Sequence, residues 1–160
     1  AVAAHFGKHV LREVEPETVE SHIGELRRAC GDRAVLRALH YYDENARVLE
    51  QAAAIRGGDL PAFFDAVKRS GDSSWKLLQN IYARPTEEQM AMGIELSRRF
   101  LHGDGAQRVH GGGFAGTIQA YVPLERLADY KKLMEDAFGP GSCTALMVRP
   151  EGAVMMPMES

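Results

Sequence analysis

Apolar residues recur at intervals of three and four positions through much of the first hundred residues, a pattern that predicts amphipathic helices. The clearest stripe begins after Asp32, a plausible N-cap, and continues to the Gly57-Gly58 pair. A second helix is predicted from Asp59 to near Gly71. The residues of its expected buried face are Phe63, Phe64 and Val67. Helices therefore dominate the first half of the predicted fold.

Weaker signals flank these two helices. The first thirty residues predict short helical pieces that are interrupted at Glu15-Pro16. The stretch 70–74 is predicted to be a loop, because Ser, Gly and Asp cluster there. Thr86 with Gln89 three positions later has the layout of a capping box, which predicts the start of a helix that ends at His102-Gly103.

The pattern changes in the last third of the chain. Residues 117–122 alternate apolar and polar side chains, which predicts a strand. A helix is expected from Pro123 to the break at 139–141, followed by a strand at 143–149 that turns into another at 153–156. This order predicts an α+β fold, with helices packed on one face of a small, mainly antiparallel sheet.

Composition excludes several classes of function. Residues 1–160 carry 19 Lys and Arg against 22 Asp and Glu, with a formal charge of -3, so we expect no nucleic-acid binding. No apolar run approaches the roughly 18–20 residues of a membrane span, and the first residues lack the layout of a signal peptide. Two distant cysteines, Cys30 and Cys143, suit a reducing compartment and form no disulfide framework. We therefore expect a cytoplasmic, single-domain chain.

A glycine cluster at 110–116 is the most distinctive local feature. Gly111, Gly113 and Gly116 match the letters of the dinucleotide fingerprint, but that fingerprint must open a helix, and here a strand follows. A P-loop is also excluded, because Thr117 and Ile118 stand where it requires Lys and then Ser or Thr. Two interpretations remain open: a tight connection between a helix and a buried strand, or a turn whose amides approach an anion.

Three segments of the chain resemble one family. The run from Arg108 to Gly116 resembles the third signature motif of the GHMP kinases, in particular its galactokinase form. The run from His40 to Val48 is similar to a galactokinase helix that carries a His, then Glu-Asn, then Arg-Val, and Ser70 to Trp75 is similar to the Ser-His-x-Ser-Leu loop of that family. The sequence departs from the family pattern at Gly71, Trp75, His110 and Ala115.

The resemblance implies a two-domain kinase that uses ATP and Mg²⁺ to phosphorylate a small molecule in the cleft between its domains. This chain corresponds to the C-terminal, ferredoxin-like domain only. The Gly-Leu-Ser-Ser-Ser nucleotide motif and the catalytic acid of the N-terminal domain are not found in it. We therefore expect no catalytic residue and no metal ligand here, an inactive isolated fragment, and the protein's own N-terminal domain as its partner. Galactose is the first candidate substrate, with another hexose or a related polyol next.

The resemblance also assigns a candidate site. The expected phosphate-proximal loop, called the glycine loop below, consists of Gly111, Gly112, Gly113, Phe114, Ala115 and Gly116. Arg108, directly before it, could contact an anion or pair with a carboxylate on a neighbouring helix, and the sequence favours neither.

Other chemistry-bearing residues have plainer explanations. His5 and His9 could share a helix face, but a solvated terminus accounts for them better than a metal site. Asp43 and Glu44 are adjacent on a helix and point in different directions, which does not suit paired acid–base work. A non-catalytic module that senses a sugar or binds a partner is the competing functional class, because the same scaffold can serve both roles.

Overall fold

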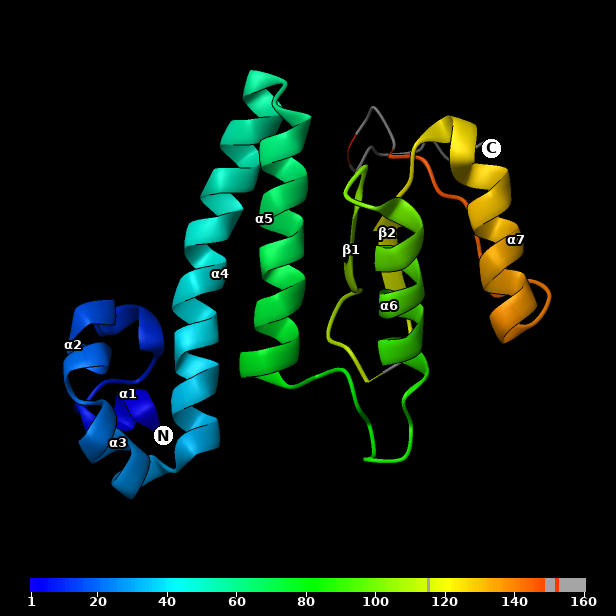
Figure 1. The fold of residues 1–160 in the computed structure, drawn as a ribbon. Coiled ribbons are helices and arrows are strands. Elements are labelled where there is room, and N and C mark those ends of the chain that lie inside the picture. Colours follow the sequence, from blue (N-terminus) through cyan, green and yellow to red (C-terminus); the bar gives the residue numbers. More distant parts are fainter. Residues whose placement is uncertain (115, 149–151, 153–160) are drawn as a thin grey trace, which may run out of the picture.

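The structure is a computed structural model that describes residues 1–114, 116–148 and 152. Its elements, in chain order, are α1 (Val2–His5), η1 (Leu11–Glu13), α2 (Pro16–Ser21), α3 (Ile23–Cys30), α4 (Asp32–Gly57), α5 (Leu60–Ser73), η2 (Ser74–Leu78), α6 (Gln89–Leu101), β1 (Ala106–Val109), β2 (Ile118–Tyr121), η3 (Leu124–Arg126) and α7 (Leu127–Phe138) (Figure 1). The α+β class with a small antiparallel sheet is confirmed.

The short N-terminal helices pack around the first half of α4 (Figure 1). Pro16 occupies the first turn of α2, where its missing N–H costs nothing, so the expected interruption becomes a helix start. This part has its own apolar core, formed by Val2, Ala3, Val14, Val19, Leu26, Val35 and Ala38. The Tyr42 hydroxyl of α4 lies 3.0 Å from the Leu11 carbonyl oxygen and 2.9 Å from that of Val14, which fixes the N-terminal segment to α4.

The long helices α4 and α5 form an antiparallel pair (Figure 1). Gly58 ends α4 in the left-handed conformation, with φ of 70°, and the Asp59 carboxylate caps α5 by accepting the Ala62 N–H at 2.9 Å. Both boundaries agree with the sequence. The expected N-cap Asp32 is instead the first residue of α4, and its carboxylate binds Arg27 at 2.6 Å.

The predicted loop at 70–74 is wrong, because α5 continues to Ser73 and then into η2, a π-helical turn. Gly71 was interpreted as a helix end, but it lies against β1. A Cβ on Gly71 would stand 3.0 Å from the Arg108 Cβ and 3.2 Å from the Gln107 carbonyl oxygen. Glycine therefore allows α5 to approach the strand closely, and packing outweighs its low helix propensity.

The sheet pairs β1 with β2 in antiparallel register, with Ala106 opposite Tyr121 and Val109 opposite Ile118. Strand β1 was not predicted. Its side chains alternate between two faces, and Ala106 contacts Phe63 and Val67 of α5, while Val109 packs with Met90 of α6. Helices thus contact both faces of this sheet, whereas the sequence predicted helices on one face only. The physical reason is that a two-stranded sheet can bury each of its faces only against a helix.

Two further predictions differ from the structure. Helix α6 begins at Gln89, so Thr86 precedes the helix and forms no capping box. Residues 143–148 contain no strand, and Leu146 and Met147 are exposed. The remainder of the predicted strand pair, Arg149 and 153–156, lies outside the described residues. Within the described part of the chain, no helix has the length and apolar character needed to cross a membrane.

Candidate functional site

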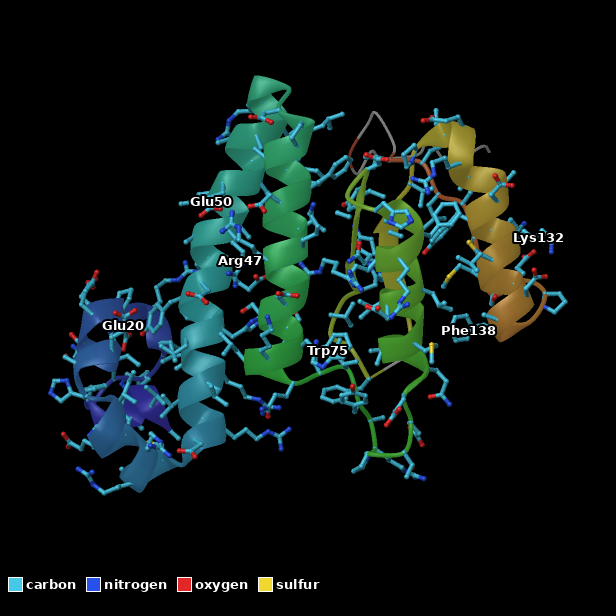
Figure 2. All side chains as sticks on the ribbon, in the orientation of Figure 1. Glu20, Arg47, Glu50, Trp75, Lys132 and Phe138 are labelled. Carbon is cyan, nitrogen blue, oxygen red and sulfur yellow. The ribbon has the colours of Figure 1, made fainter. Side chains whose placement is uncertain are left out.

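The three segments that resemble one family converge in space. Arg108 of β1 reaches α5, where its Nη1 donates a hydrogen bond to the Ser70 hydroxyl. That hydroxyl donates to Oε2 of Glu44 on α4 at 2.6 Å, and Nη1 of Arg108 lies 3.8 Å from the same oxygen. Arg47, labelled on α4 in Figure 2, donates from Nε to Oε1 of Glu44 at 2.6 Å. Glu44, Arg47, Ser70 and Arg108 are called the Glu44 network below.

The side chains of the Glu44 network are largely shielded from solvent. Ser70 is fully buried, Arg47 is 8% exposed, and the side chains of Glu44 and Arg108 are each 23% exposed. Burial opposes ionisation of Glu44, but the hydrogen bonds from Ser70 and Arg47 and the charges of Arg47 and Arg108 outweigh it, so the pKa of Glu44 lies below its ordinary value. The carboxylate is therefore held ionised between two guanidinium groups.

His40 lies one helical turn before Glu44 and extends the polar contacts between α4 and α5. Its Nδ1 is 2.9 Å from the Ser73 hydroxyl. Partial burial lowers the pKa of His40, and the positive charges of Arg47 and Arg108 act in the same direction, against the opposing effect of Glu44 and Asp43. This lowering favours the neutral ring, which serves as a hydrogen-bonding group to Ser73.

The structure bears on the two interpretations of Arg108. Its guanidinium faces Ser70, Ser74 and Glu44, and its Nε donates to the Val109 carbonyl oxygen at 3.0 Å. Pairing with a carboxylate on a neighbouring helix is thus observed. Contact of Arg108 with an anion stays a prediction. The guanidinium group of Arg108 already binds Ser70, Ser74 and Glu44 within the chain.

The glycine loop follows β1 and precedes β2 in the chain, and of its described residues Gly111, Gly112, Phe114 and Gly116 are exposed. The His110 N–H donates to the Thr117 carbonyl oxygen at 3.1 Å, which closes the base of the loop. Gly111, Gly113 and Gly116 have φ of 59°, 72° and 82°, values that only glycine adopts at no steric cost. Ala115 lies outside the described residues. The expected tight connection is therefore a hairpin connection rather than a link from helix to strand.

Asn80 is the residue that sequence reasoning missed. It lies two positions after the end of η2, is 1% exposed, and contacts the glycine loop with both its backbone and its side chain. The sequence shows neither that Asn80 is buried nor that its side-chain partner, Gly112, lies 32 positions away.

The loop has the chemistry of an anion contact. Within the described residues, the N–H groups of Gly111, Gly112 and Gly113 donate no hydrogen bond. A Cβ on Gly111 or Gly112 would meet no atom within 4 Å, so the space around the Cβ positions of these two residues is open. Backbone amides of this kind bind phosphate or carboxylate oxygens.

The remaining candidates do not form a site. In the described part of the chain, no three His, Cys, Asp or Glu residues gather as metal ligands would. His5 Nε2 pairs with Glu25 at 2.9 Å, and the Asp43 side chain is half exposed and 3.8 Å from Arg47. Burial raises the pKa of the Cys143 thiol, which opposes a nucleophilic role.

Comparison with curated proteins identifies relatives of this chain. It is 30% identical over 138 residues to a galactokinase of Mannheimia succiniciproducens, a match that covers 86% of the chain and 34% of the relative. Galactokinases of Haemophilus influenzae and Glaesserella parasuis are each 30% identical over 136 residues, covering 85% of the chain and 34% of the relative. No protein-family model matches the chain.

These similarities confirm the resemblance inferred from the three motifs. The chain is homologous to galactokinases over most of its own length. It spans about a third of the length of the curated relatives that it matches. The extent of the match is consistent with a C-terminal segment of a protein of that type.

Proposed function

We propose that this chain is the C-terminal domain of a longer sugar kinase of the galactokinase type, which transfers a phosphoryl group from ATP to galactose or a related sugar. One observation carries the proposal: the three segments that resemble galactokinases are far apart in sequence and meet around Arg108, three positions before the glycine loop begins. The similarity to galactokinases over 86% of the chain supports the same conclusion.

In this proposal the chain contributes one wall of the cleft. The Glu44 network fixes α4 and α5 against β1, and β1 leads directly into the loop that borders the phosphates. The N–H groups of Gly111 to Gly113 would donate to phosphate oxygens, since they have no acceptor in the described part of the chain. Positioning and electrostatic stabilisation of this kind account for most of catalysis in phosphoryl transfer.

The residues present fit a phosphate but not a metal. Exposed backbone amides suit phosphate oxygens, whereas the described residues offer no cluster of carboxylates for Mg²⁺. The chemistry that Mg²⁺ would supply when bound with ATP is neutralisation of the charge that develops on the phosphates. We infer that the nucleotide, the metal and the catalytic acid are held mainly by a preceding domain, and that this chain alone is inactive.

A coupled assay of ADP release tests the proposal. The full-length gene product is incubated with Mg²⁺, ATP and a panel of hexoses and polyols, and this 160-residue chain is assayed in parallel. We expect turnover with galactose or a close relative by the full-length protein, and none by the chain alone. Sugar binding in calorimetry without ADP release would instead favour the non-catalytic sensing module, and absence of both would refute the sugar-kinase proposal.

A further inference from the structure

Asn80 holds the glycine loop by three separate contacts. The Phe114 N–H donates to the Asn80 carbonyl oxygen at 3.0 Å, and Nδ2 of Asn80 donates to the Gly112 carbonyl oxygen at 3.1 Å. Gly113 packs directly on Asn80, because a Cβ at Gly113 would lie 2.2 Å from the Asn80 carbonyl oxygen. The middle of the loop is therefore fixed to one residue that is almost completely buried.

The backbone on both sides of this contact is strained. Phe114 has φ of 58° and Gln79 has φ of 59°, and neither is a glycine. Such conformations persist where the surrounding structure imposes them, and they gather at functional sites. Phe114 is also 48% exposed, so burial of its ring does not explain why the chain tolerates the strain.

Asn80 itself sits on a rigid base. The Gln79 N–H donates to the Ser74 carbonyl oxygen at 2.8 Å, which closes the π-helical turn before Asn80. Ile81, the next residue, is 2% exposed and packs with Val109 and Met90. Trp75, labelled after the end of α5 in Figure 2, makes an edge-to-face contact with Tyr82. The segment that carries Asn80 is therefore held from both sides.

One polar atom in this arrangement has no partner. Oδ1 of Asn80 is buried and accepts no hydrogen bond from the described residues. A buried amide oxygen without a hydrogen-bond donor lowers the free energy of unfolding, and an apolar residue of similar size would avoid this loss. The Nδ2 contact to the loop gives a reason for an Asn at this position.

We propose that Asn80 is a positioning residue for phosphoryl transfer: it holds the glycine loop in the conformation in which the amides of Gly111 to Gly113 donate to no acceptor in the described part of the chain. The inference rests on the proposed function. Asn80 would not touch the phosphates, because its side chain is buried beneath the loop. It acts by fixing the loop backbone in advance, so that binding does not have to order it.

Two variants test the contact in the full-length protein. Asn80→Ala removes the Nδ2 hydrogen bond, and Asn80→Asp keeps the volume while removing the donor. The matched control is Ser97→Ala, because Ser97 is fully buried and bonded to the Gly93 carbonyl oxygen and the Tyr130 hydroxyl, away from the loop. The readouts are amide hydrogen exchange of the peptide spanning 110–117, kcat, and the melting temperature.

In the 110–117 peptide, the amides of His110 and Phe114 donate hydrogen bonds. We expect exchange of these two amides to rise about tenfold in both Asn80 variants, because loss of the Nδ2 hydrogen bond to Gly112 lowers the free energy needed to open the loop. In Ser97→Ala this peptide should exchange as in the wild type. We also expect kcat to fall about tenfold or more in the Asn80 variants, while their melting temperatures match that of Ser97→Ala or exceed it. A purely structural role would lower activity only in proportion to stability.

The outcomes separate the two proposals. Unchanged exchange of the 110–117 peptide in Asn80→Asp overturns the positioning role. Raised exchange with wild-type kcat also overturns it, because the loop conformation would then not matter to catalysis. If the wild-type full-length protein releases no ADP with any sugar, the proposed kinase function fails, and with it the role of Asn80 in phosphoryl transfer. The contact between Asn80 and the glycine loop is still tested in that case by hydrogen exchange of the 110–117 peptide.

Discussion

Gly112 offers a direct perturbation of the glycine loop that leaves the fold intact. A Cβ at this position would meet no atom within 4 Å, and φ of Gly112 lies outside the left-handed region. Its carbonyl oxygen accepts from Asn80 and is unaffected by a methyl group. Gly112→Ala should therefore keep the free energy of unfolding, or raise it by about 0.4–1 kcal/mol through the lower entropy of the unfolded chain.

The expected effect on catalysis is much larger. If a phosphate oxygen approaches the Gly112 amide, the added methyl group occupies the space that this oxygen needs, and one hydrogen bond to a charged group is lost. Such a bond contributes about 1.5–3 kcal/mol, which corresponds to a fall of roughly 10- to 150-fold in kcat/KM.

The assay is steady-state ADP release by the full-length protein, with urea unfolding as the measure of stability. Gly57→Ala is the matched control, because Gly57 at the end of α4 also has open space around its Cβ position and no positive φ. Equal kcat/KM in the two variants would refute the idea that the loop borders the phosphoryl group.

Three further predictions concern stability. Glu44→Gln should lower the free energy of unfolding by about 1–3 kcal/mol at pH 7. Because the pKa of Glu44 in the folded state is lowered from 4.5, this contribution is present above pH 4.5 and is lost as pH falls through the folded-state pKa. The difference between variant and wild type in urea titrations should therefore shrink at acid pH, and an unchanged difference would contradict the pairing. Gly71→Ala should lower the free energy of unfolding by about 1–3 kcal/mol, because the added Cβ crowds β1. Gly24→Ala in α3 is the control: its Cβ would meet only Nη1 of Arg28 at 3.8 Å, so it should leave stability unchanged or raise it. The opposite order of melting temperatures would reject the packing argument. Asp59→Ala should cost about 0.5–2 kcal/mol through loss of the α5 cap, and an unchanged melting temperature would show that the cap contributes nothing.

Sequence reasoning succeeded where local patterns determine structure. The apolar stripe after Asp32 and the cap at Asp59 depend on neighbours within a few residues, and α4 and the start of α5 form as predicted. Gly71 gave the wrong prediction for the opposite reason. Its small size serves a contact with Arg108, thirty-seven positions away, and no local rule separates this glycine from a helix end.

The candidate site was partly predictable. The motifs placed Arg108 and the glycine loop together, because they are close neighbours in the chain. The pairing of Arg108 on β1 with Glu44 on α4 could not be derived from spacing. Nor could the contacts of Asn80, because its partners Gly112 and Phe114 lie more than thirty positions further along the chain. Strand β1 was missed because the four residues from Ala106 to Val109 are too few to show an alternation.

The central claim is that the glycine loop lies beside the phosphates of ATP in the full-length protein. Hydrogen exchange of the 110–117 peptide, measured with and without Mg²⁺, a non-hydrolysable ATP analogue and galactose, tests it most directly. The proposal predicts slower exchange of this peptide when all three are bound, while a peptide covering 16–30 in the N-terminal helices stays unchanged. Slower exchange elsewhere in the protein with no change at 110–117 would contradict the claim.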